Sequence, residues 1–229
     1  MRWAILTLTF AMACAPVVAA DAKSKTAGRL DDSASLFSEI MGTPDRSIPQ
    51  ELLEKAHGIV LVPDLKKAAF VAGGKYGRGF AICRAAEGTG WGPPAAIRIE
   101  GGSVGFQIGV SSSDVVMLVM NERGMQKLSS SKFTIGADAN AAAGPVGRNA
   151  TAQTDAFMTA EILSWSRSKG LFAGVSLDGA TLRNDLDENE ALYGQRWTSK
   201  QILGSGAKMP EAASKLIAVL NNYSMRQRK

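Results

Sequence analysis

Residues 165–179 read W-S-R-S-K-G-L-F-A-G-V-S-L-D-G, and the rest of the chain can be arranged around this stretch. Its centre has the period of a β-strand, because every second side chain from Leu171 to Leu177 is apolar or small and points to one face. Arg167 to Gly170 introduces the strand, and Asp178-Gly179, a dipeptide suited to a turn with positive φ, closes it. We therefore expect a strand between two turns, the last of a series that builds one sheet, with a scaffolding role.

Further strands are expected upstream, where the hydrophobic period is two and glycine, proline and serine separate the segments. Short, evenly spaced strands of this kind predict an antiparallel meander that is twisted enough to approach a barrel. The candidates are residues 59–62, 68–72, 79–83, 95–99, 104–110 and 114–120, with expected turns at 73–77, 101–102 and 111–113. Helical periodicity predicts helices at 33–41, 50–57, 121–129, 184–193, 199–203 and 210–223. The predicted fold class is α+β: a strongly twisted, barrel-like antiparallel β-sheet with flanking N- and C-terminal helices.

The first twenty residues have the pattern of a secretory signal peptide. Arg2 precedes an apolar run from Trp3 to Ala13, and small residues lead to an expected cleavage after Ala20. Loss of residues 1–20 removes one charge, Arg2, and lowers the formal net charge from +5 to +4. The segment Ala11-Met-Ala-Cys14 also loosely matches the site where bacterial lipoproteins are lipidated, which would anchor the protein. The expected location is the periplasm or the outer envelope, in released or lipid-anchored form.

The mature chain is expected to contain a leader and one domain. Residues 21–47 are predicted to be a flexible leader with a short amphipathic helix at 33–41, and residues 48–229 a single domain with a C-terminal helix. The helix carries one apolar face, formed by Leu36, Phe37, Ile40 and Met41. Two alternatives stay open for this face: docking on the domain's own core, or insertion at a lipid interface. Cys83 is the only cysteine left in the mature chain and is expected to be a buried thiol.

Three short patterns suggest chemistry and fail on their context. Residues 101–105 match G-x-S-x-G, but a strand follows where the hydrolase elbow needs a helix, and the only histidine, His57, lies upstream. Residues 73–79 lack the spacing of a phosphate loop, so a hairpin turn bearing Lys75 and Arg78 is expected there. Residues 185–189 begin like a calcium loop, but Glu190 and Arg196 occupy its deciding positions, and a solvated acidic helix start explains the pattern. We expect no enzyme activity, no cofactor and no metal site.

An ordered set of motifs resembles the SYLF domain over residues 48–194. The motifs are Ile48-Pro49, Ala56-His-Gly58 with Pro63, Gly77-Arg-Gly79, Trp91-Gly-Pro-Pro94, Gly105-Phe-Gln-Ile-Gly109, Phe133-x-x-Gly136, Ala143-Gly-Pro-x-Gly-Arg148, Ser166-Arg-Ser-Lys-Gly-Leu-Phe-Ala-Gly174, Asp178-Gly179 and Tyr193-Gly194. The resemblance implies a lipid-binding module: eukaryotic members bind phosphoinositides and some bind actin, and bacterial members have a proposed phospholipid-binding role. It implies no catalytic residue.

The leading hypothesis is a non-catalytic phospholipid-binding module of the bacterial cell envelope that associates with anionic membrane surfaces. The apolar face of residues 36–41 would insert, and scattered cations would meet phosphate. The expected lipid-contacting residues are Leu36, Phe37, Ile40, Met41, Lys23, Lys25, Arg29, Arg46, Lys75 and Arg78, with Cys14 as the lipidation site. Nucleic acid is excluded because the basic residues are few and scattered, and actin is judged unlikely because of the signal peptide. The alternative is a structural or protein-interaction domain of the envelope without a lipid ligand.

Overall fold

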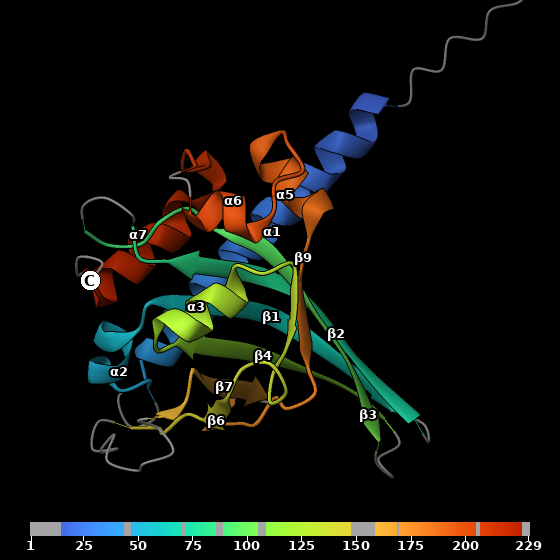
Figure 1. The fold of residues 1–229 in the computed structure, drawn as a ribbon. Helices are drawn as coiled ribbons and strands as arrows, with labels where there is room; N and C mark the ends of the chain where they lie inside the picture. The colour runs from blue at the N-terminus through green and yellow to red at the C-terminus, as the bar shows by residue number, and fades with distance from the viewer. Residues whose placement is uncertain are drawn as a thin grey trace, which may run out of the picture.

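A curled, nine-stranded sheet forms the centre of this computed structural model, and helices lie along it (Figure 1). The structure describes residues 15–43, 47–69, 72–85, 89–104, 109–147, 159–168, 170–204 and 207–225. The arrangement confirms the predicted fold class, since the sheet bends into a half-barrel flanked by an N-terminal helix and by C-terminal helices.

Four long strands make up the middle of the sheet: β1 (Gly58–Ala69), β2 (Ala72–Cys83), β3 (Ala95–Val104) and β4 (Gly109–Val119). The short strands are β5 (Lys132–Thr134), β6 (Ala141–Ala143), β7 (Ile162–Ser168), β8 (Leu171–Gly174) and β9 (Thr181–Asn184). The strand order is β5-β9-β3-β2-β1-β4-β7-β6, and β8 pairs with β7. The opening stretch of sequence is confirmed as the hairpin β7–β8, although β9 follows it in the chain.

Four of the six predicted upstream strands, 59–62, 79–83, 95–99 and 114–120, lie in these long strands to within one residue, whereas 68–72 and 104–110 include residues outside the described part of the chain. The expected turns at 73–77, 101–102 and 111–113 lie inside β2, β3 and β4. Gly77, in the first of these expected turns, allows close packing inside a strand and does not mark a turn, since a Cβ there would lie 2.9 Å from Leu65 Cδ1. The pairing also departs from a meander, because β4 pairs with β1 and not with β3. One pair, β6 with β7, is parallel.

Six α-helices and a 3₁₀ turn are described: α1 (Ala15–Met41), α2 (Gln50–Lys55), α3 (Glu122–Leu128), α5 (Leu186–Tyr193), α6 (Ser199–Gly204), η1 (Glu211–Ala213) and α7 (Ser214–Tyr223). Capping fixes two of the starts, because the side chains of Asn121 and Asp185 accept hydrogen bonds from the backbone N–H of Gly124 and Glu188. These helices agree with the sequence prediction except at the N-terminus.

The sequence predicts a flexible leader from residue 21 up to the short helix at 33–41, whereas the structure has one continuous helix from Ala15 to Met41. Its buried seam mixes polar and apolar residues, Thr26, Leu30, Ser33 and Phe37, so hydrophobicity alone does not reveal it. The Thr26 and Ser33 hydroxyls donate to carbonyl groups one turn earlier, which satisfies them in the buried seam. The expected cleavage point after Ala20 falls within this helix. No described helix is both long and apolar enough to cross a membrane.

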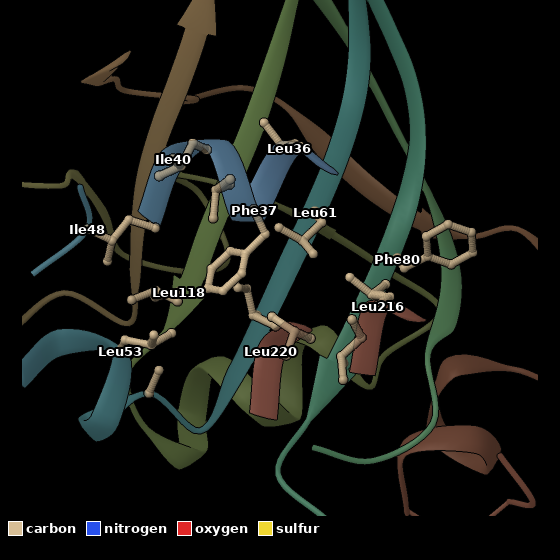
Figure 2. Packing of buried hydrophobic residues seen from close by; sticks show 14 of the residues in the cluster. Leu36, Phe37, Ile40, Ile48, Leu53, Leu61, Phe80, Leu118, Leu216 and Leu220 are labelled. Carbon is tan, nitrogen blue, oxygen red and sulfur yellow. The ribbon is translucent and has the colours of Figure 1, made fainter. Parts of the chain in front are cut away.

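The core has two layers, one on each face of the sheet. The outer layer lies between the sheet and helices α1, α2 and α7, with Phe37 near its middle (Figure 2). The Phe37 ring meets Tyr223 edge-on, with centroids 5.7 Å apart. The inner layer fills the half-barrel and includes Cys83, whose thiol is buried and free as predicted.

Candidate functional site

A bulge divides β1 into two halves with different surroundings. The register of β1 against β2 shifts between Leu61 and Lys66, and Asp64 there has φ of 58°, a rare value for a residue with a side chain. Before the bulge the strand is buried on both faces. Beyond it the four long strands run past the helices and become exposed (Figure 1). We call residues 63–69, 72–78, 99–104 and 109–114 the projecting end of the sheet.

A groove of about 360 Å³ lies between the N-terminal half of α1 and the projecting end. The helix contributes Lys25, Gly28, Arg29 and Asp32, and strands β1 and β2 contribute Pro63, Asp64, Lys66, Tyr76, Gly77 and Arg78. Tyr76 is 45% exposed, which is unusual for an aromatic residue in the middle of a sheet. The groove therefore combines an exposed aromatic ring with charged side chains of both signs.

Two buried carboxylates of α5 hold the arginines of this groove. Arg29 forms an ion pair with Glu188, and Arg78 Nε lies 3.1 Å from Asp185 Oδ2. The Asp185 and Glu188 side chains are almost completely buried, so the expectation of a solvated acidic helix start is wrong. These carboxylates face the arginines and not water, and α1 and β3 pack against α5.

Burial and neighbouring charge act differently on the two guanidinium groups. Burial, followed by the repulsion of Arg78, lowers the pKa of Arg29 from its usual value. Burial alone would also lower the pKa of Arg78, but its hydrogen bond to the Tyr76 hydroxyl and the charge of Asp185 outweigh that effect and raise it. Arg78 Nε donates to the Tyr76 oxygen over 2.9 Å, so the arginine orients the exposed ring.

The structure gathers three of the predicted cationic residues in this groove, namely Lys25, Arg29 and Arg78, and each has a carboxylate partner within the chain. Lys25 pairs with Asp21 at 2.6 Å, in addition to the two arginine pairs above. The groove is therefore close to electrically balanced, and its cations are not a free cluster for phosphate. A surface of this composition suits a polypeptide better than an anionic headgroup.

The remaining predicted residues lie elsewhere. Lys23 is exposed on α1, and Lys75 lies on the opposite face of β2 from Tyr76. Arg46 and Cys14 fall outside the described residues. Tyr76 was missed by the sequence interpretation, because residues 73–77 were assigned to a turn.

The four apolar residues of the expected lipid-inserting face belong to the outer core. Leu36, Phe37 and Ile40 are at most 3% exposed, and Met41 packs against them. Of the two alternatives, the structure shows docking on the domain's own core (Figure 2). Lipid contact by these side chains stays a prediction, and it requires α1 to leave the sheet.

The acidic side chains and the surroundings of His57 bear on catalysis and metal binding. Among the residues described, no three His, Cys, Asp or Glu side chains come together as metal ligands. His57 lies beside a second cleft of about 590 Å³ between α3 and α6, with Glu122 and Lys200 at its rim. Ser129 and Ser130 line the same cleft.

Comparison with known proteins places this architecture in a family. Residues 100–223 match the Ysc84 family, described as "Las17-binding protein actin regulator". Protein YSC84 of Saccharomyces cerevisiae is 33% identical over 203 residues, which cover 87% of this chain and 43% of that protein. LAS seventeen-binding protein 3 of the same yeast is 31% identical over 209 residues, 90% of this chain and 45% of that protein.

A human protein, SH3 domain-containing YSC84-like protein 1, is 31% identical over 191 residues, which cover 82% of this chain and 55% of that protein. The chain thus spans about half of the length of the curated relatives that it matches.

These comparisons correct the expected partners. The sequence interpretation favoured a phospholipid or membrane surface and judged actin unlikely, whereas the family description and the relatives' names refer to Las17 binding and to actin regulation. The family is described as a regulator and not as an enzyme. Actin was judged unlikely only because of the signal-peptide pattern in residues 1–20, and that pattern carries no information on which surface of the domain binds a partner.

Proposed function

The chain belongs to the Ysc84 (SYLF) family, and from this premise we propose that it is a protein-binding domain whose partner is actin or a protein of the actin-regulating machinery. The family description carries this proposal, since it names a protein partner and a regulatory role. The sequence also left open, as an alternative to lipid binding, a structural or protein-interaction domain. The protein-interaction part of that alternative agrees with the proposal. The envelope location stays a prediction, which mass spectrometry of the native N-terminus tests by distinguishing a start at Asp21 from a lipidated Cys14.

We assign the binding surface to the groove and the adjoining projecting end. Tyrosine and arginine are enriched at the centres of protein interfaces, because each combines a large contact area with a polar group. Here Tyr76 and Arg78 stand side by side, hydrogen-bonded to each other, and Arg78 is held from below by Asp185. Such support keeps the side chains in one conformation before the partner arrives, which lowers the entropy that binding must overcome.

The exposed face of the projecting end extends the same surface. Ala68 and Val110 are paired across β1 and β4, and Val110 is 83% exposed. Lys66 is paired with Tyr76 across β1 and β2, and Ala68 follows Lys66 by two residues, so its side chain lies on the same face of the sheet. An apolar strip next to a charged groove is the usual composition of a protein interface, with contact area in the middle and charges at the rim.

Co-sedimentation of the full chain with filamentous actin tests the proposal. We expect wild-type protein in the actin pellet and about tenfold weaker binding by Tyr76→Ala, since loss of a central aromatic anchor typically costs at least 1.4 kcal/mol of binding free energy. The control is Tyr223→Phe, which removes a hydroxyl far from the groove. Wild-type protein that binds anionic vesicles but neither actin nor purified Las17 would refute the proposal.

A further inference from the structure

Two lysines face each other across β1 and β2 at the projecting end, and we propose that this lysine pair, Lys67 and Lys75, binds carboxylates of an acidic segment on the protein partner. The inference rests on the proposed function and adds the chemistry of the partner's contact site. The lysine pair lies on the face of the sheet opposite to Tyr76, so the partner would contact both faces of the projecting end.

The register places the two ammonium groups together. Lys67 and Lys75 are directly opposite in the antiparallel ladder, and their side chains therefore point to the same face. That face also carries Leu65 and Gly77, and a Cβ on Gly77 would lie 2.9 Å from Leu65 Cδ1. Like charges in this position repel each other, so the arrangement reduces the stability of the fold.

Nearby carboxylates relieve this repulsion only in part, through the charge of Asp178 close to Lys75. Glu100 is engaged by Arg98 at 2.9 Å and by Arg183 at 3.2 Å, on the other face of β3. Asp64 pairs with Lys66, and Asp114 pairs with Arg167. Within the described parts of the chain, neither Lys67 nor Lys75 has a carboxylate oxygen within salt-bridge distance.

Lys75 is also fixed in place. Its aliphatic stem lies across Gly101, where an added Cβ would come within 2.7 Å of Lys75 Cε. Its ammonium reaches the backbone carbonyl of Asp178 at 3.4 Å, while the Asp178 carboxylate accepts a hydrogen bond from Ser176. Burial and then the charge of Lys67 lower the pKa of Lys75 against the opposing charge of Asp178, so an added anion would stabilise the charged form of Lys75.

A partner carboxylate placed between the two ammonium groups would offset their repulsion and supply the missing acceptors. An acidic protein segment fits this position because the outer face of the same strands offers Tyr76 and Val110, which favour a polypeptide partner over a headgroup. Charge complementarity of this kind fixes the register of a complex and raises its association rate.

The test compares three proteins in actin co-sedimentation at low and at high salt: wild type, Lys67→Gln with Lys75→Gln, and a matched control, Lys132→Gln with Lys208→Gln, which removes two exposed lysines elsewhere. We expect the first double variant to bind about tenfold more weakly and to lose most of the salt dependence, while the control keeps both. Fluorescence anisotropy with a labelled oligoglutamate peptide should show the same ranking.

A stability measurement separates recognition from folding. Lys67→Glu should place an opposite charge next to Lys75, so we expect a higher melting temperature together with weaker actin binding. A scaffold role for the lysines predicts a lower melting temperature for Lys67→Glu and for the double variant Lys67→Gln with Lys75→Gln. That result would overturn the inference.

The outcomes for the two proposals differ. If wild-type protein binds actin and the Lys67 and Lys75 variants bind equally well, the lysine-pair inference fails and the proposed function stands. If wild-type protein binds neither actin nor Las17, the proposed function fails. The Lys67 and Lys75 variants could instead lose binding to anionic vesicles and keep binding to oligoglutamate. That result would assign the lysine pair to lipid and overturn the inference.

Discussion

The two halves of β1 and β2 belong to the same strands and have opposite surroundings. From Gly58 to Val62 each strand residue is buried, because α1, α2 and α7 cover one face and the half-barrel interior covers the other. From Lys66 onwards the same strands carry lysines, glycines and an exposed tyrosine. The bulge at Asp64 is the boundary between them.

This contrast indicates that the two halves of one sheet have different roles: the covered half stabilises the fold, and the projecting half is available for binding. The covered half supplies folding energy, since apolar burial contributes about 25 cal/mol per Å² removed from water. The projecting half buries little and is therefore under less packing constraint, which leaves its residue choice open to binding. Substitutions in the covered half should therefore cost more stability than substitutions in the projecting half.

Phe37→Ala should lower the free energy of unfolding by about 3–5 kcal/mol, because it leaves a cavity in the outer core and removes the edge-on contact with Tyr223. Urea unfolding followed by circular dichroism measures this loss. A change below 1 kcal/mol would mean that α1 contributes little to the fold, and would revive lipid insertion as the role of its apolar face.

Asp185→Ala should be destabilising by about 1–2 kcal/mol, since α5 loses its N-cap and Arg78 loses its ion-pair partner, an interaction already weakened by the partial exposure of Arg78. Asp185→Asn is the matched control, because it keeps a capping oxygen and removes only the charge. Equal losses for the two substitutions would show that the ion pair, and not the cap, holds this end of α5.

Tyr193 links stability to alkaline pH. Burial raises the pKa of its hydroxyl, which donates to the Pro94 carbonyl at 2.6 Å. The unfolded chain releases this proton from about pH 10 while the folded chain retains it, so stability should fall as the pH rises above that value. Tyr193→Phe should cost about 1 kcal/mol at neutral pH and flatten the alkaline decline. An unchanged decline would contradict this assignment.

Tyr76→Ala should change the free energy of unfolding by less than about 0.5 kcal/mol, because the ring is exposed and its removal leaves no cavity. It is the matched counterpart of Phe37→Ala, an aromatic truncation in the other half of the molecule. A loss comparable to that of Phe37→Ala would show that the projecting end is part of the stability core and would remove the proposed division.

The sequence predicted the covered half well and the projecting half poorly, for a physical reason. Alternating apolar residues mark a strand that is buried on one face, and a continuous apolar run marks one that is buried on both, so runs such as Ile59–Val62 and Phe80–Cys83 were found. The projecting strands lack this signal. Their glycines and serines have the composition of turns, and only the sheet pairing shows that residues 73–77 and 111–113 extend the ladder.

The same limit applied to the site. Arg29 and Arg78 were predicted from charge alone. Their neutralisation by Glu188 and Asp185 could not be predicted, because those pairs join residues more than one hundred positions apart in the chain. The helix α1 was shortened in the prediction because Thr26 and Ser33 break its apolar seam. The family resemblance was confirmed, but its inferred partner was wrong.

The most direct test of the central claim, that the projecting end carries protein recognition, is one co-sedimentation series with filamentous actin using wild type, Tyr76→Ala and Phe37→Leu. The account predicts actin binding by wild type, about tenfold weaker binding by Tyr76→Ala at an unchanged melting temperature, and wild-type binding by Phe37→Leu despite its lower melting temperature. Equal binding by wild type and Tyr76→Ala, with a loss in Phe37→Leu, would contradict it.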